Sequence, residues 1–175
     1  MAAEKAHADR EVLDLEPALH AFARRAVGDR DLARDLVQET LLAVVAGRAG
    51  YQGRASLRTW AIGILTHKVV DHFRTRDRLA PPDESAVDAL AEPSGDVRPD
   101  RVLARREALS IIERTLGELP ALERLAVLLI DVEGQDRADA CRSLALTANH
   151  LRVLLHRGRH RLRRALERAG VTDGI

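Results

Sequence analysis

Arginine and histidine side chains are concentrated near the end of the sequence, where TANHLRVLLHRGRHRLRRALER (residues 147–168) holds seven arginines and three histidines. Leucine recurs through the same stretch at steps of three and four, which predicts an amphipathic helix with one packed face and one cationic face. Guanidinium groups pair with phosphate oxygens, so this pattern favours binding of a polyanion such as DNA. Taken alone, the segment is equally consistent with a solvated basic helix or with a helix resting on an anionic membrane surface.

Residue types that could support catalysis or metal binding do not form a recognisable motif. His156 and His160 are four residues apart, but the pair lacks the intervening Glu of HExxH, and the neighbouring arginines oppose binding of a cation. His67 and His72 are five residues apart and diverge around a helix. The sequence contains no GxxxxGK[ST] loop and no GxSxG elbow. We therefore expect no enzymatic activity, no metal and no cofactor.

The overall composition predicts an all-α protein. Of the 175 residues, 46% are hydrophobic but only 2% aromatic, and the formal net charge is +1. Ala, Leu, Val and Arg favour helices that pack through aliphatic stripes. The single cysteine, Cys141, forms no internal disulfide, and we expect a buried structural thiol. With neither a signal sequence at the start nor a run of about 18 apolar residues, we expect a cytoplasmic protein without membrane insertion.

Hydrophobic periodicity in the first half predicts three helices separated by short breaks. Gly28 is expected to end the first helix, Asp29 to cap the second and Ser56 to cap the third, with a loop at GYQGRAS (residues 50–56). The inward faces expected for the three helices are Leu15, Leu19, Phe22 and Ala26; then Ala33, Leu36, Val37, Thr40, Leu41 and Val44; then Leu57, Trp60, Ala61, Ile64, Leu65 and Val69. For Trp60 we favour core packing over stacking against a ligand.

An acidic, proline-containing segment follows the third helix. Four prolines and six acids without a sustained apolar period predict a flexible linker over 80–101, between helical domains at 10–79 and 102–172. In the second domain we expect helices at 101–117, from Pro120 to Gly134, at 136–144, and over the basic segment. A short helix, a tight turn and a long basic helix form a helix-turn-helix, whose second helix enters the major groove of DNA.

Two groups of motifs together resemble the extracytoplasmic-function (ECF) sigma factors, the promoter-recognition subunits of bacterial RNA polymerase. In the first half these are DRDLARDLVQETLLAV and SLRTWAIGILTHKVVDHFR, and in the second LPALERLAVLLIDVEG followed by LRVLLHRGRHRLR. The resemblance implies that the first domain binds polymerase and opens the minus-10 element, while the second reads the minus-35 element. It implies core RNA polymerase (clamp helices and flap) and promoter DNA as partners, with an anti-sigma factor as a candidate third partner.

The resemblance also implies three sets of contact residues. Polymerase binding is expected at Asp35, Gln38 and Glu39; minus-10 binding at His67, Lys68, Asp71, His72, Arg74 and Arg76; and minus-35 binding at Thr147, Asn149, Arg152, Val153, His156, Arg157 and Arg159. Departures from the family pattern accompany these matches. His67 stands where the family usually has Asn, which changes the hydrogen bonds offered to a base. Ala145 replaces the usual turn glycine, and His150, Leu151 and Leu154 also differ from the usual residue types.

Two other functions are consistent with parts of the sequence. A DNA-binding regulator with a helical sensor domain would bind an operator without polymerase. An amphipathic protein of the membrane surface would bind liposomes without any sequence preference.

Overall fold

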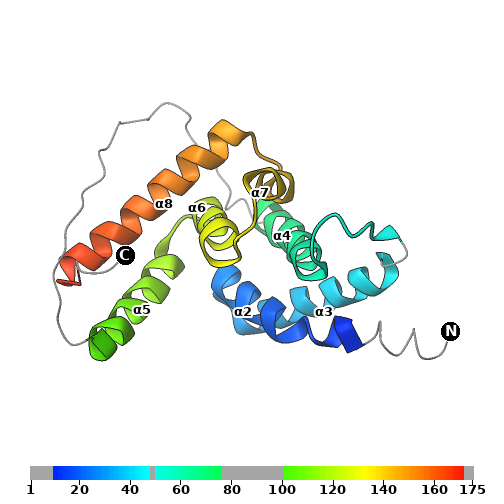
Figure 1. Ribbon diagram of the computed structural model, residues 1–175, viewed down its shortest axis with the longest axis horizontal. Helices are drawn as coiled ribbons and strands as arrows, with labels where there is room; N and C mark the ends of the chain where they lie inside the picture. Colours follow the sequence, from blue (N-terminus) through cyan, green and yellow to red (C-terminus); the bar gives the residue numbers. More distant parts are fainter. Residues whose placement is uncertain (1–9, 48–49, 76–100, 172–175) are drawn as a thin grey trace.

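The computed structural model describes residues 10–47, 50–75 and 101–171, with side chains described from residue 106 in the last range. All the secondary-structure elements in these ranges are helices, which confirms the all-α prediction (Figure 1). In chain order the elements are α2 (Glu16–Val27), α3 (Arg30–Gly47), α4 (Leu57–Thr75), α5 (Arg101–Glu118), α6 (Ala121–Val127), the π-helical segment η2 (Leu128–Val132), α7 (Arg137–Leu144) and α8 (Ala148–Arg168).

The helices of the first half begin and end where the capping residues predict. Gly28 adopts the left-handed conformation, with φ of 75°, after the last turn of α2. Asp29 Oδ1 accepts hydrogen bonds from the backbone N–H groups of Asp31 (2.9 Å) and Leu32 (3.1 Å) at the start of α3. Ser56 Oγ accepts one from the N–H of Thr59 (3.0 Å) at the start of α4. These bonds satisfy N–H groups that have no partner within the helix.

Helix α4 is buried over a wider face than its predicted stripe. Ala61, Leu65 and Val69 are buried as expected, but Ile62 and Val70, outside the stripe, are at most 2% exposed. The reason is that α4 has neighbours on more than one side, since it contacts α2, α3 and α7. A helix that is apolar around most of its circumference is typically buried on several sides.

The two halves of the chain pack against each other and share one hydrophobic core. Helix α7 lies against α4 so closely that a Cβ added to Gly63 would be 3.3 Å from Ser143 Oγ. Arg58 Nη2 lies 2.7 Å from Glu133 Oε2, and the Glu133 side chain is only 5% exposed. Helix α2 also contacts α5 and α6. The linker predicted at 80–101 falls outside the described residues except for its last position, which begins α5.

The second half contains the predicted helix-turn-helix, preceded by a π-helical turn. The Glu133 N–H donates to the Leu128 carbonyl (2.9 Å), and Gly134, with φ of 64°, follows the segment. Asp136 caps α7 by accepting a hydrogen bond from the N–H of Asp139 (2.7 Å), and this bond lowers the pKa of Asp136. Ala145 then makes the turn in the left-handed conformation, with φ of 54°.

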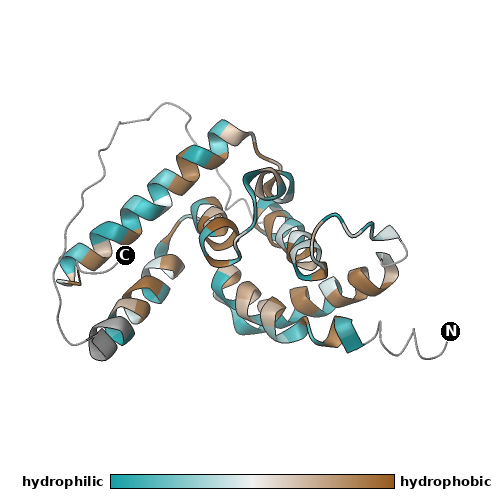
Figure 2. Ribbon diagram, viewed as in Figure 1, coloured by the Kyte–Doolittle hydropathy of each residue, from teal (hydrophilic) through white to brown (hydrophobic). Residues whose placement is uncertain are grey.

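Helix α8 is the most clearly two-faced element of the molecule. Figure 2 shows hydrophobic positions alternating with strongly hydrophilic ones along its length. Leu151, Leu155 and Gly158 are buried, whereas Leu162 and Ala165 are half-buried. Its basic residues therefore lie on the remaining surface.

Candidate DNA and polymerase interfaces

The three residues predicted to bind polymerase share the exposed face of α3. Asp35, Gln38 and Glu39 are all exposed, because the opposite face of the helix is buried in the core. The exposed face continues toward the end of α3 with two apolar side chains, Leu42 (71% exposed) and Val45 (56% exposed). Acids and an amide followed by apolar groups on one rigid helix suit the docking of a basic partner helix.

Most of the described residues predicted to bind the minus-10 element lie on the solvent-facing side of α4. His67, Asp71 and Arg74 are exposed, and Arg74 Nη1 lies 4.0 Å from Asp71 Oδ1. His72 is half-buried, and its ring and that of Phe73 are in an edge-to-face arrangement at a centroid distance of 5.9 Å. Lys68 is also half-buried. The sixth predicted residue, Arg76, lies outside the described residues.

Lys68 forms an ion pair with one of the predicted polymerase contacts. Its Nζ lies 2.9 Å from Glu39 Oε2 of α3. The two side chains are 29% and 59% exposed, so water screens the pair and its net contribution to folding is about 0 to 1 kcal/mol. A weak pair of this kind can exchange partners at low cost.

An aromatic pair lies where the loop before α4 meets that helix. The rings of Tyr51 and Trp60 are 5.1 Å apart and tilted by 33°, and the Tyr51 hydroxyl donates to the Ala55 carbonyl. Trp60 is half-buried and also lies against Gly47, where an added Cβ would be 3.3 Å from the indole. Trp60 thus packs against the core, as predicted from the sequence, while part of its side chain remains accessible to solvent.

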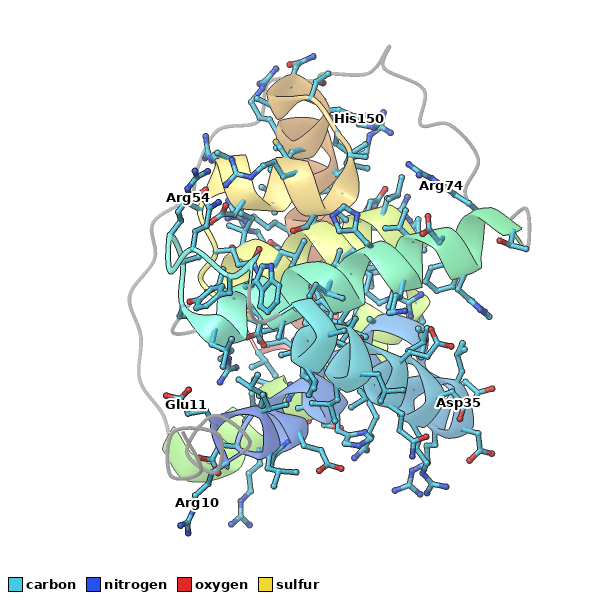
Figure 3. The ribbon with its side chains drawn as sticks, turned by 90° about the vertical axis from the view of Figure 1, so that its right-hand side faces the viewer. Arg10, Glu11, Asp35, Arg54, Arg74 and His150 are labelled. Carbon is cyan, nitrogen blue, oxygen red and sulfur yellow. The ribbon has the colours of Figure 1, made fainter. Side chains whose placement is uncertain are left out.

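The predicted minus-35 residues of the first turns of α8 have differing surroundings. Arg152 and His156 are exposed, and Arg152 Nη2 donates to Asn149 Oδ1 (3.0 Å). The Thr147 hydroxyl caps the helix by accepting from the His150 N–H (3.2 Å). Val153 is 6% exposed and offers little surface to a ligand. Figure 3 shows His150, at the start of α8, near the top of the view and Asp35 of α3 at the lower right, well apart from each other.

Two arginines of α8 are held by acids that the sequence did not indicate as partners. Arg159 Nε and Nη2 donate to the carboxylate of Asp131 (3.0 and 2.6 Å), and these bonds raise the pKa of Arg159. Arg161 Nε lies 3.1 Å from Glu123 Oε2, whose side chain is 6% exposed. Burial raises the pKa of Glu123, and the positive charges of Arg161 and Arg157 oppose that rise. Both acids come from α6 or η2, far from α8 in sequence, so helical spacing could not predict the pairs.

The histidines and the cysteine form no metal site within the described part of the chain. No group of three or more His, Cys, Asp or Glu side chains there could hold a metal ion. His156 and His160 stack in parallel, with ring centroids 6.5 Å apart. Cys141 is half-buried and packs against the core. Among the same described residues, no helix has the length and apolar character needed to span a membrane.

The sequence matches two family models, Sigma-70 region 2 over residues 12–79 and Sigma-70, region 4 over residues 109–162. It is 34% identical over 149 residues to the ECF RNA polymerase sigma factor SigF of Caulobacter vibrioides, a match that covers 85% of this chain and 78% of the relative. It is 24% identical to the ECF RNA polymerase sigma factor SigX of Bacillus subtilis, with 85% and 78% covered.

The fold is also similar to a solved structure. The sigma factor RpoE of Bartonella quintana, crystallised in complex with the anti-sigma factor NepR, superposes with a TM-score of 0.64 at 26% identity, covering 90% of this chain and 95% of RpoE. Regions 2 and 4 in this order, on an all-helical fold, define a sigma-70-type initiation factor. The chain belongs to the ECF sigma factors, which direct RNA polymerase to promoters.

Proposed function

We propose that this sigma factor acts in the cytoplasm, performs no bond chemistry, and divides its work between residues 10–79 and 102–172. The first segment binds the polymerase clamp and opens the minus-10 element, and the second reads the minus-35 element. The observation that carries the division is the separation of two surfaces of different charge. Asp35, on the acidic and amide face of α3, lies well apart from His150 at the start of the basic helix α8 (Figure 3).

The polymerase contact is assigned to Asp35, Gln38 and Glu39. Their exposed carboxylates and amide can pair with arginine or lysine side chains of the clamp helices, which sets partner choice and orientation. Because Glu39 also pairs with Lys68, engagement of Glu39 by polymerase would release a cation for the DNA backbone.

The minus-10 contact is assigned to the exposed side of α4 and the loop before it. His67, Asp71 and Arg74 lie on this side, with Lys68 and His72 at its margins. A base extruded from the duplex loses stacking worth a few kcal/mol, and the accessible part of the Tyr51–Trp60 pair offers an aromatic surface nearby. Differential binding of the opened strand would favour melting.

The minus-35 contact is assigned to the first turns of α8. Arg152 and His156 face solvent together, and a guanidinium there can pair with both acceptors of a guanine in the major groove. Thr147, Asn149 and Arg157 are proposed to contact phosphates, and Val153 to make at most a small apolar contact. Arg159 is oriented by Asp131 and would approach DNA as part of that pair.

An anti-sigma factor is a further proposed partner. The support is the Bartonella relative, which was crystallised with one.

Two substitutions, one on each of the two surfaces, test the division. Arg152→Ala should lower selection of a promoter with an intact minus-35 element by about 5- to 150-fold, the equivalent of about 1 to 3 kcal/mol for one base contact. The same variant should bind core polymerase normally in a fluorescence titration. Asp35→Arg should weaken core binding because it reverses the charge offered to the clamp.

Transcription from templates with and without the minus-35 element provides the control. The defect of Arg152→Ala should disappear on the template that lacks the element. If Arg152→Ala weakened core binding as much as it weakened promoter selection, the proposed division would be wrong.

A further inference from the structure

Helix α8 carries two parallel rows of basic side chains, and from the second row the function proposed above uses only Arg157. Arg152, His156, Arg159 and Arg163 follow one another at steps of four, three and four residues. Arg157, Arg161, Arg164 and Arg168 repeat the same steps five residues later. At about 100° per residue, the two rows lie about 140° apart around the helix. A helix that reads bases with the first row turns the rest of the second row away from those bases.

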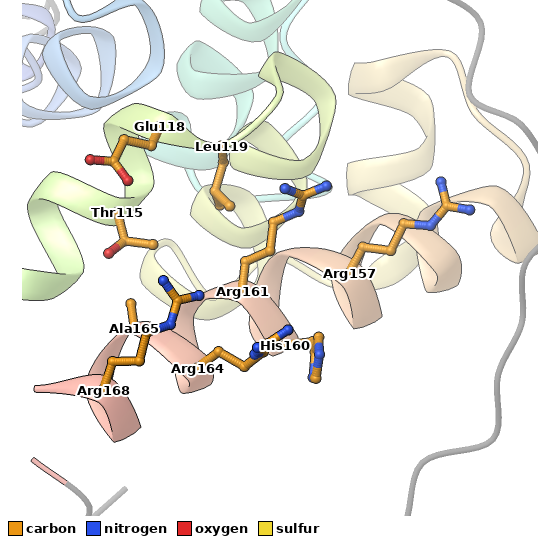
Figure 4. A pocket seen from close by; sticks show the side chains of 9 residues that line it. All are labelled: Thr115, Glu118, Leu119, Arg157, His160, Arg161, Arg164, Ala165 and Arg168. Atoms are coloured by element: carbon orange, nitrogen blue, oxygen red, sulfur yellow. The ribbon is translucent and has the colours of Figure 1, made fainter. Parts of the chain in front are cut away.

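The second row borders a cavity between α8 and α5. The cavity has a volume of about 510 Å³, and all four arginines of the second row line it, together with His160 (Figure 4). Helix α5 contributes Thr115 and Glu118 to the facing wall, and Leu119 directly follows the helix. The lining therefore contains four guanidinium groups and only one carboxylate, that of Glu118.

The last two arginines of the second row are also too far along α8 to reach bases. At about 1.5 Å per residue, Arg164 and Arg168 lie about 24 and 30 Å beyond Ala148, at the start of the helix. The major groove is only about 12 Å wide, so a helix that inserts its first turns leaves its last turns outside. No described acid forms an ion pair with Arg164 or Arg168.

We propose that this cavity, here called the α5–α8 groove, binds a ligand that carries a chain of two or more phosphate groups. Its volume lies in the range of about 300 to 1,000 Å³ that is typical of small-molecule sites. Guanidinium groups bind phosphate oxygens through paired hydrogen bonds, and a row of them matches several linked phosphates better than one isolated anion. An apolar ligand is excluded by the charge of the lining.

One ion pair and three further lining residues shape the groove. Arg161 is oriented by Glu123 at 3.1 Å, so one of the four guanidinium groups is held in place before any ligand binds. Thr115 is 7% exposed and forms part of the wall that α5 contributes. Leu119 and Ala165 supply an apolar part of the lining. The phosphate chain could belong to a nucleotide or to inorganic polyphosphate, which share this chemistry.

The test measures ligand binding by the full chain and is independent of promoter activity. Tripolyphosphate, ATP, GTP and inorganic phosphate would each be titrated calorimetrically at about 0.15 M salt, where long-range surface electrostatics are largely screened. We expect tripolyphosphate or a nucleoside triphosphate to bind at least tenfold more tightly than inorganic phosphate. Binding should also raise the Tm as ligand concentration rises.

A charge-matched pair of variants locates the site. Arg164→Gln with Arg168→Gln should weaken triphosphate binding at least tenfold, whereas Arg152→Gln with Arg163→Gln, from the other row, should change it less than twofold. Tighter binding of a nucleotide than of tripolyphosphate would show that the nucleoside takes part, and equal binding that the phosphate chain alone is recognised.

Three outcomes would overturn the proposal. These are no binding of tripolyphosphate, ATP or GTP; an equal loss in both double variants, which would indicate only diffuse attraction; and a groove variant that loses promoter DNA binding but keeps triphosphate binding, which would assign the second row to DNA.

Discussion

Ala145 makes the turn of the helix-turn-helix in a conformation that suits glycine, with φ of 54° and ψ of 46°. Its Cβ is crowded in the left-handed region, at a cost of about 1 to 2 kcal/mol. Glycine avoids this cost. Its unfolded chain has more conformational freedom, however, and this lowers the free energy of unfolding by about 0.5 to 1 kcal/mol. Ala145→Gly should therefore stabilise the protein by roughly 0.5 to 1 kcal/mol, measured as a rise in urea midpoint with an unchanged m-value.

Ala138→Gly is the matched control for Ala145→Gly. Ala138 is exposed within α7, where the backbone is right-handed, so the same chemical change should destabilise the protein by about 0.5 to 1 kcal/mol. A destabilising Ala145→Gly would mean that the turn does not adopt the left-handed conformation.

The contact between α6 and α8 depends on a glycine that allows two helices to approach closely. A Cβ added to Gly158 would lie 2.8 Å from Val127 Cγ2 and 3.4 Å from the Glu123 carbonyl oxygen. Val127 is β-branched and 3% exposed, so it has little room to move. Gly158→Ala should force the helices apart and destabilise the protein by about 1 to 3 kcal/mol, as overpacked cores do. Thermal unfolding followed by circular dichroism measures the effect.

Gly117→Ala is the matched control for Gly158→Ala, because both glycines lie within helices. Gly117 is exposed near the end of α5, and no atom lies within 4 Å of an added Cβ. Gly117→Ala should therefore stabilise the protein by about 0.5 to 1 kcal/mol. Equal effects of the two substitutions would contradict the close packing of α6 and α8.

The sequence predicts the helices well because their signals are local. Gly28, Asp29 and Ser56 end or cap the elements as expected, since a cap and the N–H groups that it satisfies are only a few residues apart. The sequence also contains a signal for the additional buried face of α4, since Ile62 and Val70 are apolar although they lie outside the predicted stripe.

Parts of the candidate interfaces could not be predicted because they depend on tertiary contacts. The sequence shows the basic residues of α8, but only the fold shows that Asp131 holds Arg159 and that Glu123 lies beside Arg161. The α5–α8 groove likewise requires two helices separated by three intervening elements.

At the scale of the whole molecule, the packing of α7 against α4 fixes the distance between the two proposed DNA-binding surfaces. Elements at minus-35 and minus-10 are about 25 base pairs apart, which is about 85 Å of duplex at about 3.4 Å per base pair. A compact chain of this length has a diameter of about 40 Å. The packed arrangement is therefore too short to contact both elements, and we expect the α4–α7 contact to open on the promoter.

A reversible cross-link tests this opening. Gly63→Cys with Ser143→Cys, in a Cys141→Ser background, places two thiols where an added Cβ lies 3.3 Å from the partner side chain. Oxidation should lower promoter-specific run-off transcription more than tenfold, and reduction should restore it. Each single-cysteine variant should be insensitive to oxidant. Full activity of the cross-linked protein would show that opening is unnecessary.

The central claim is that this chain gives core RNA polymerase the ability to choose promoters. The most direct test is transcription in vitro by core polymerase on a library of genomic fragments, with and without the purified protein, followed by mapping of transcript 5′ ends. We predict that the protein concentrates initiation at a small set of sites that share upstream sequence elements. An identical distribution of start sites with and without the protein would contradict the claim.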